Sequence, residues 1–245
     1  RYVGCGGSVL GAVRHNGFIP WDDDIDIYMP RKDYNKLLLL DSEAQKDGYS
    51  IFCIENNPGY YNAWAKVVYN NSSLWEVKMH PFMIGAFVDI FPLDEFSGSD
   101  EEITAIQFKS DQLFNDYIKS IRDYNYTDLI KFFFNRNRTG CKSWWKSKFY
   151  NSENKRKAYF DFQKSYLGQN GDKTVCPDTW LGKIFKKAWF TDVIEMPFED
   201  TTLTIPRDYD AYLTLLYGDY MSPPPPDKRV SQHFHYFVDL DRRVS

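Results

Sequence analysis

The chain has 245 residues, of which 43% are hydrophobic and 26% are charged, and its formal net charge is −4. These are ordinary values for a globular protein with a substantial core, and no apolar run approaches the roughly 20 residues of a membrane-spanning helix. The four cysteines form no C-x-x-C pair and no zinc-finger spacing with histidine, which argues against a structural zinc site or a disulfide framework and favours a reducing compartment. The chain opens on Arg1 inside a predicted strand, so we expect that the natural chain begins earlier and that any leader or anchor would lie outside this sequence.

The first predicted elements place a glycine turn and two aspartates close together in the sequence. Residues 2–10 are small and apolar with three glycines, which predicts a strand, a tight turn and a helix that begins near Ser8. Backbone amides at such a helix start can approach a phosphate, although glycine turns are common. From Asp24 onward polar and apolar residues alternate, so a strand would carry Asp24 and Asp26 on one face.

The remaining elements predict an α+β fold with a largely helical second half. A helix is expected over residues 31–47, with Gly48 as its stop, and a Ser99/Glu102 capping box starts another helix that runs to about residue 122. The expected strands lie at 49–54, 63–69, 87–91 and 201–205. Residues 126–190 read as mainly helical, including a segment over 180–188, and a last helix should open at Pro206 and close at Gly218. We therefore expect a catalytic core at 1–98, a helical, basic and aromatic region at 99–190 that completes the cleft, and a segment at 191–245 that packs back on the core.

Basic residues are concentrated between residues 131 and 164. This stretch has ten Lys/Arg against two Asp/Glu, whereas the rest of the chain has 20 against 32. Phe and Trp are interleaved with the charges, so the stretch could meet phosphates, an anionic glycan or a membrane surface, or it could form solvated helix faces. The acidic balance elsewhere disfavours long contacts with nucleic acid. We expect no nucleic-acid partner, and we keep peripheral membrane contact open.

The paired acids and a third aspartate indicate a metal site. Carboxylates two residues apart on a strand have backbones roughly 6–7 Å apart and point the same way, so Asp24 and Asp26 can converge on Mg²⁺ or Mn²⁺. They could instead cap a turn or face solvent. Asp89, however, stands within the apolar run FVDIF, where a charge is costly unless it is paired or coordinated. Three acids on two neighbouring strands would suit phosphoryl transfer.

At residues 7–27 the sequence GSVLGAVRHNGFIPWDDDIDI resembles the signature of the LicD family, the lipopolysaccharide cholinephosphotransferase group that also includes fukutin and fukutin-related protein. Shorter similarities follow: FVDIFPLD at 87–94, PFE at 197–199, and YGDY at 217–220 followed by two prolines. Residues 99–190 carry no recognisable motif of this family.

The resemblance implies a nucleotidyltransferase-like fold, in which helices flank a mixed sheet, and a metal-dependent transferase. The reaction would move a phospho-alcohol, such as phosphocholine or a polyol phosphate, from a CDP-linked donor to a hydroxyl of a glycan or lipid-linked glycan. Gly6, Gly7 and Ser8 would form the turn that holds the donor phosphates. Asp24, Asp26 and Asp89 would bind the metal, Mg²⁺ or Mn²⁺, and Asp89 would also assist deprotonation of the acceptor.

Five further side chains are candidates for substrate contact. Arg14 and His15 lie between the glycine turn and the acids, where they could bind phosphate or face solvent. Lys66 stands in an apolar strand and could bind phosphate or extend its amine to the surface. His233 and His235 follow a run of four prolines at 223–226 and could close over the site or form a partly exposed surface.

Two other functions remain compatible with the sequence: a nucleotidyltransferase that makes an activated nucleotide, and a glycan-binding module without turnover. The resemblance leaves the alcohol open between choline, glycerol and ribitol. Bacterial members of the family act in the cytoplasm, often at the inner membrane face, and animal members act in the Golgi lumen. The expected location therefore depends on whether the chain comes from a bacterium or an animal.

Overall fold

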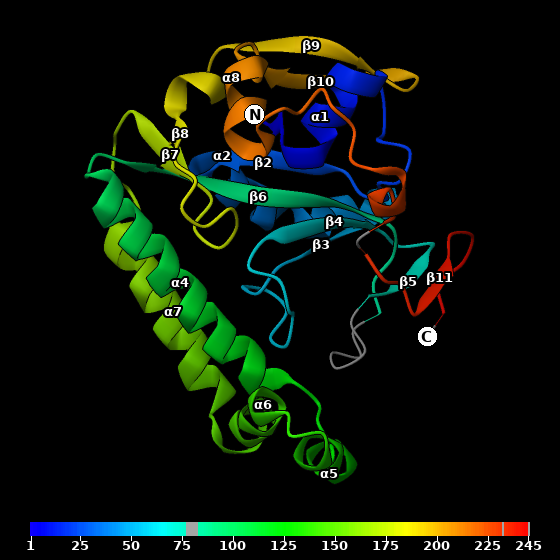
Figure 1. Ribbon diagram of the computed structural model, residues 1–245, viewed down its shortest axis with the longest axis vertical. Helices are drawn as coiled ribbons and strands as arrows, with labels where there is room; N and C mark the ends of the chain where they lie inside the picture. The colour runs from blue at the N-terminus through cyan, green and yellow to red at the C-terminus, as the bar shows by residue number, and fades with distance from the viewer. Residues whose placement is uncertain (77–82, 232, 245) are drawn as a thin grey trace.

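The computed structural model describes residues 1–76, 83–231 and 233–244 (Figure 1). Within these residues a seven-stranded sheet forms the centre, with strand order β1-β2-β6-β4-β3 and with β7 and β8 continuing from β6. Its strands are β1 (Val3–Gly4), β2 (Asp26–Pro30), β3 (Tyr49–Phe52), β4 (Ala65–Tyr69), β6 (Phe87–Phe96), β7 (Lys173–Val175) and β8 (Phe185–Lys186). β2 and β6 are parallel and the other neighbours are antiparallel. The predicted α+β class with a mixed sheet is confirmed.

Different elements cover the two faces of the sheet. One face packs against α1 (Gly6–His15), α8 (Tyr209–Tyr217) and the hairpin of β9 (Val193–Phe198) and β10 (Thr201–Pro206), as Figure 1 shows. The other face packs against α2 (Arg31–Leu37) and α3 (Asp41–Ala44). Side chains alternate along β2, so Tyr28 enters the first core and Ile27 the second. The same alternation places Asp26 on the α1 face.

Four helices form an arm that extends from the sheet (Figure 1). They are α4 (Asp100–Ile121), α5 (Tyr126–Phe134), α6 (Arg138–Phe149) and α7 (Ser152–Tyr166). The predicted capping box at the start of α4 is present, because Ser99 and Glu102 each accept a backbone hydrogen bond from the other. α4 and α7 pack together along the arm, and α5 and α6 lie at its far end. The arm ends at Tyr166, and the chain then returns to the sheet through β7 and β8.

The C-terminal part of the chain passes the edge of the sheet after α8. A 3₁₀ turn at Pro226–Lys228 begins at the last proline of the run, and β11 (Phe237–Asp239) then pairs antiparallel with β5 (Ser73–Trp75). This small ribbon holds the segment around His233 beside the acids described below.

Three predicted boundaries near the N-terminus differ from the structure. α1 begins at Gly6, two residues before Ser8, and β2 begins at Asp26, so Asp24 precedes the strand. The helix expected over 31–47 is divided by 3₁₀ turns into α2 and α3. Within it, the carboxylate of Asp41 accepts a hydrogen bond from the Ile51 amide of β3, at 2.7 Å, and so ties this segment to the sheet edge. The stop at Gly48 is confirmed by its left-handed φ of 85°.

The helix expected over 180–188 is wrong. Trp180 and Gly182 adopt positive φ values of 51° and 77°, which interrupt a helix, and Phe185 starts β8. The apolar residues of this segment pack into the core from a turn and a short strand instead. Pro206 ends β10 rather than opening α8, which begins at Tyr209. The strands β5, β7, β8, β9 and β11 were not anticipated.

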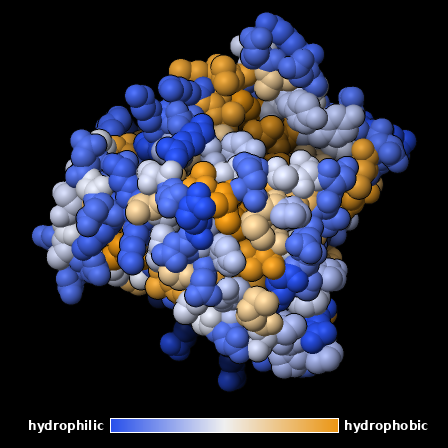
Figure 2. Space-filling model, turned by 90° about the horizontal axis from the view of Figure 1, so that it is seen from above, coloured by the Kyte–Doolittle hydropathy of each residue, from blue (hydrophilic) through white to orange (hydrophobic). Residues whose placement is uncertain are grey.

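None of the helices in the described parts of the chain combines the length and apolar composition needed to cross a bilayer. Figure 2 looks down on the side of the β9–β10 hairpin and shows a mainly hydrophilic surface on which hydrophobic residues form several separate groups.

Candidate active site

Parallel pairing of β2 with β6 brings two acids side by side. Asp26 is the register partner of Asp89, and the Asp89 amide donates to the carbonyl of Ile25 at 2.9 Å. Asp24 lies two residues before Asp26, directly ahead of the strand. One carboxylate oxygen from each of the three aspartates lies within 4.8 Å of the other two. The structure thus brings together the three acids that the sequence indicated.

The electrostatics of this cluster fit a divalent cation. Burial, together with the charges of Asp24 and Asp89, raises the pKa of Asp26 to about 8. The Oδ1 atom of Asp26 is buried and has no hydrogen-bond partner in the part of the chain that the structure describes. A buried carboxylate oxygen without a partner, next to two other carboxylates, is a costly arrangement that a cation would relieve. An all-oxygen set of donors is the one that Mg²⁺ and Mn²⁺ prefer.

Asp89 is held from the side of β4. The Nζ atom of Lys66 lies 2.9 Å from Oδ1 and 3.0 Å from Oδ2, and the indole nitrogen of Trp64 donates to Oδ1 at 2.6 Å. Lys66 is 2% exposed, lies 3.5 Å from Glu76 and stands over the ring of Phe87. Its amine therefore contacts Asp89 of the cluster and the neighbouring Glu76, and Lys66 is absent from the pocket wall, whereas the sequence suggested a phosphate contact.

The glycine turn lies directly beside the acids. Gly6 has a left-handed φ of 51°, and a Cβ atom on it would lie 3.7 Å from Oδ2 of Asp26. The Gly6 amide donates to the hydroxyl of Tyr212, and the buried Ser8 hydroxyl accepts from the Asp26 amide at 2.8 Å. Of the three turn residues, Gly7 lines the pocket, while Gly6 and Ser8 fix the turn and the start of β2.

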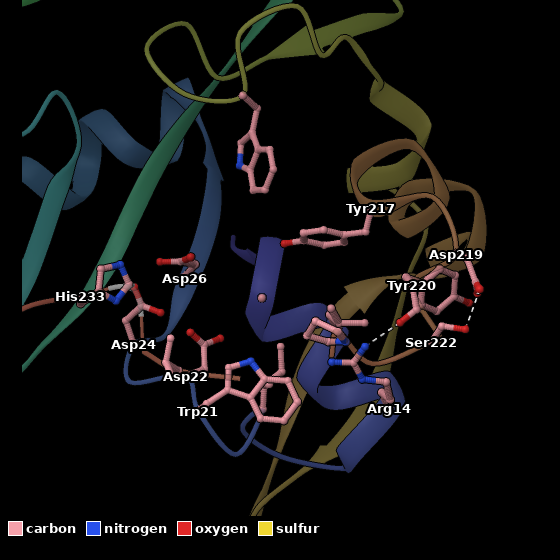
Figure 3. A pocket seen from close by; sticks show the side chains of 16 residues that line it. Arg14, Trp21, Asp22, Asp24, Asp26, Tyr217, Asp219, Tyr220, Ser222 and His233 are labelled. Carbon is pink, nitrogen blue, oxygen red and sulfur yellow. Dashed lines mark hydrogen bonds and ion pairs between the residues drawn. The ribbon is translucent and has the colours of Figure 1, made fainter. Parts of the chain in front are cut away.

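A pocket of about 560 Å³ opens in front of the acids (Figure 3). Asp24, Asp26 and His233 lie along one side of it, and Arg14 lies on the opposite side. Aromatic rings form much of the remaining wall, namely Trp21, Trp180, Tyr217 and Tyr220. The pocket therefore combines an acidic edge, a cationic edge and apolar ring faces, a composition typical of a ligand site.

Arg14 projects into this pocket from α1. Its Nη1 donates to the Tyr220 carbonyl at 2.7 Å, and its Nε contacts the ring nitrogen of His15 at 3.0 Å. The remaining donors of the guanidinium have no hydrogen-bond partner within the described residues. His15 does not line the pocket; it contacts Arg14 and packs edge-on against Trp21.

His233 closes one end of the acidic edge. Its Nδ1 lies 2.7 Å from Oδ1 of Asp23, and its Nε2 lies 3.6 Å from Oδ2 of Asp24. Partial burial opposes protonation of the imidazole, but the hydrogen bond to Asp23 and the nearby carboxylates outweigh it and raise the pKa of His233. His235 also approaches Asp23, at 3.6 Å, so the two histidines share one acid.

A family model described as "LicD/FKTN/FKRP, nucleotidyltransferase domain" matches residues 1–129, which is more than half of the chain. The chain belongs to the LicD family. It is also 27% identical over 247 residues to the lipopolysaccharide cholinephosphotransferase LicD of Haemophilus influenzae (strain ATCC 51907 / DSM 11121 / KW20 / Rd). That alignment covers 93% of this chain and 84% of the relative.

The matched LicD segment contains only part of the pocket. It includes the glycine turn, Arg14 and all three acids, whereas Trp180, Tyr217, Tyr220 and His233 come from beyond residue 129. Tyr217 and Tyr220 belong to the YGDY similarity noted in the sequence, which could have nominated them as wall residues. For Trp180 there was no such signal, because its position depends on the unpredicted turn before β8.

Proposed function

We propose that this LicD-family chain is a metal-dependent phosphotransferase. It moves a phospho-alcohol, phosphocholine or a polyol phosphate, from a CDP-linked donor to a hydroxyl of a cell-surface glycan or its lipid-linked precursor. The relative from H. influenzae is named a lipopolysaccharide cholinephosphotransferase, which supports phosphocholine as the first group to test and lipopolysaccharide as the class of acceptor.

The convergence of Asp24, Asp26 and Asp89 is the observation that carries the proposal, because Asp24 and Asp26 line the pocket and the buried Asp89 lies directly beside them. Three carboxylates, one with an unpartnered buried oxygen, suit the binding of Mg²⁺ or Mn²⁺. When bound there, such a cation would neutralise negative charge on the donor's pyrophosphate. A glycan-binding module without turnover would have no need for this costly cluster.

Different residues of the pocket would bind different parts of the donor. Arg14 faces the acids across the pocket and can bind a phosphate oxygen, and Gly7 lets the α1 backbone approach the ligand because it has no side chain. The rings of Trp21 and Tyr217 offer faces on which a base can stack and from which water is excluded.

Asp24 is better placed than Asp89 to accept the proton of the acceptor hydroxyl. Both oxygens of Asp89 are engaged by Lys66, and one also by Trp64, and the side chain is 7% exposed. Asp24 lines the pocket, so its carboxylate can meet an acceptor hydroxyl that is bound there. We therefore transfer to Asp24 the deprotonation role first considered for Asp89.

The test is release of CMP by the purified protein in the presence of Mg²⁺, with CDP-choline, CDP-glycerol and CDP-ribitol as donors and a lipopolysaccharide acceptor. Asp24→Asn and Asp26→Asn should each lower turnover by about 100-fold or more. The matched control Asp200→Asn changes an exposed aspartate in the β9–β10 turn and should leave turnover unchanged. Unchanged turnover in both site variants would refute the assignment.

The same assay distinguishes the proposed phosphotransferase from a nucleotidyltransferase, the alternative activity that the same fold would allow. A nucleotidyltransferase would convert CTP and a phospho-alcohol into a CDP-alcohol and pyrophosphate. Production of pyrophosphate from CTP and phosphocholine, without CMP release from any CDP-alcohol, would replace the proposal with that reaction.

A further inference from the structure

The helix α5 exposes an apolar stripe to solvent. Tyr126, Ile130, Phe133 and Phe134 are 74%, 54%, 71% and 78% exposed. Their spacing of four, three and one residues puts them on one side of the helix. An exposed stripe of this kind on a soluble surface is costly and points to a binding surface.

This stripe is not the side by which α5 packs on the protein. Phe132 faces inward, where its ring meets Tyr124 edge-on at 5.5 Å and leaves no room for a Cβ atom on Gly140. The capping box of Asn125 and Asp128 fixes the start of the helix. The helix is therefore anchored by one side and presents the other.

The neighbouring helix α6 adds a second apolar pair. Trp145 and Phe149 are one turn apart, are 51% and 64% exposed, and have stacked rings with centroids 5.2 Å apart. The other tryptophan of this helix, Trp144, is buried and donates to the Asn125 carbonyl, which joins α6 to the start of α5. Both helices thus expose rings while a separate set of side chains holds them together.

Positive charge accompanies these rings. Residues 126–150, here termed the α5–α6 tip, contain six Lys/Arg and one Asp, whereas the rest of the chain has 24 Lys/Arg and 33 Asp/Glu. Among the described residues, Lys146 is the one basic residue of the tip that forms an ion pair, with Asp116 at 2.6 Å. The unpaired cations of the tip are Lys131, Arg136, Arg138, Lys142 and Lys148.

We propose that the α5–α6 tip docks on an anionic lipid bilayer. Exposed Phe, Ile and Trp side chains can enter the boundary between headgroups and acyl chains, while the unpaired Lys and Arg side chains meet anionic headgroups. A nucleic acid would use the charges but would leave Ile130 and the neighbouring phenylalanines in water. The combination of an apolar stripe with unpaired cations fits the bilayer.

The placement of the tip suits this role. Figure 1 shows α5 and α6 at the far end of the arm, viewed close to their axes, so they run across the arm and can lie along a membrane plane. The 22-residue helix α4 spans about 33 Å between the tip and the sheet. Docking would therefore hold the pocket well above the bilayer, at the height of a glycan that extends from its lipid. The docking surface itself does not depend on the proposed reaction.

Sedimentation with lipid vesicles tests the proposal. Vesicles of phosphatidylcholine with about 30 mol% phosphatidylglycerol should bind the full chain at least about tenfold more tightly than pure phosphatidylcholine vesicles. Raising the salt from about 0.1 M to about 0.5 M should weaken that binding. Equal binding to both kinds of vesicle, or no binding to either, would overturn the proposal.

Variants with matched controls test whether the α5–α6 tip is the surface that binds the vesicles. Ile130→Ser with Phe133→Ser and Phe134→Ser should reduce vesicle binding about tenfold or more, whereas Leu39→Ser with Leu40→Ser removes exposed leucines elsewhere and should not. Arg136→Gln with Arg138→Gln and Lys142→Gln should weaken binding to anionic vesicles, whereas Lys32→Gln with Lys186→Gln and Lys228→Gln should not.

Circular dichroism and thermal unfolding verify that each variant is folded, because all substituted side chains are exposed. A dimer that the triple serine variant abolishes, together with unchanged vesicle binding, would identify the stripe as a contact between copies of the chain and would overturn the proposal.

Discussion

The amine of Lys66 lies within 3.0 Å of both carboxylate oxygens of Asp89, and this pair is buried at the edge of the acidic cluster. Lys66 neutralises part of the charge that three aspartates bring together, and it fixes the orientation of Asp89. Lys66 and Asp89 lie directly opposite each other in the antiparallel pairing of β4 with β6, so the geometry of the sheet sets the distance between their backbones. A cation at the cluster and the Lys66 amine are therefore two sources of positive charge for the same acids.

The first prediction concerns this pair. Lys66→Met should lower the free energy of unfolding by about 3 kcal/mol or more, because the buried carboxylate of Asp89 and the partly buried carboxylate of Glu76 would lose their cation. Mg²⁺ should restore part of the loss, so urea unfolding of the variant should depend on Mg²⁺ more strongly than that of the natural protein. Lys36→Met, which breaks an exposed pair with Asp33, should cost about 0.5 kcal/mol or less. A loss that Mg²⁺ leaves unchanged would contradict this prediction.

The second prediction concerns protons. Because burial and the neighbouring carboxylates raise the pKa of Asp26 to about 8, the metal-free protein holds a proton there at neutral pH. Mg²⁺ binding requires the carboxylate, so it should release a proton at pH 7, and affinity should rise as the pH approaches 8. Calorimetry in buffers of different ionisation enthalpy measures this release, and Asp26→Asn should abolish it.

The same shift has a consequence for stability without metal. The folded-state pKa of Asp26 lies above its unfolded value, so its protonated form stabilises the fold at low pH, and this contribution is lost as the pH rises through about 8. In chelator, Asp26→Asn should flatten the decline in melting temperature between about pH 4, where an unfolded aspartate titrates, and about pH 8. An identical decline in both proteins would show that Asp26 titrates normally.

The third prediction concerns the glycine turn. A Cβ atom on Gly7 would lie 2.6 Å from Oδ2 of Asp22, a side chain that can move, so Gly7→Ala should change stability little but narrow the pocket. We expect turnover to fall about tenfold or more. In Gly98→Ala the new methyl meets the carboxylate of Glu102, outside the pocket wall, and activity should persist. Full activity in Gly7→Ala would remove this residue from the site.

The fourth prediction concerns Arg14. Arg14→Gln should raise the KM for the CDP-alcohol donor about tenfold and affect kcat less, because a phosphate contact made before reaction would be lost. Arg207→Gln removes an arginine that pairs with Asp192 on an exposed surface, and it should leave both constants unchanged. Steady-state kinetics decides, and an effect on kcat alone would contradict the binding role.

The acidic edge of the site could be predicted from sequence because its signals are local. Alternation near Asp26 and the isolated charge of Asp89 in an apolar strand are visible within a few residues, and parallel pairing of the two strands does the rest. The role of Lys66 could not be predicted from local sequence. Whether a lysine amine in an apolar strand contacts a carboxylate or extends to solvent depends on which strand pairs with it.

The aromatic wall depends on contacts between distant parts of the chain. The apolar residues near Trp180 have helical spacing, but the positive φ values of Trp180 and Gly182 and the pairing of β8 with β7 override that periodicity. Short strands such as β7 and β8 have little periodicity of their own, and their partners alone define them. His233 likewise reaches Asp23 only because β11 pairs with β5.

The pocket joins Gly7 to His233 and so draws on segments more than two hundred positions apart. During synthesis on the ribosome, the sheet strands up to β6 can emerge and pair long before the residues around Tyr217 and His233 are made. Nascent chains and products of premature termination would then carry the three acids without the wall that encloses a donor. Such fragments should neither bind nor hydrolyse the donor, so catalytic competence would arise only once translation has passed His233.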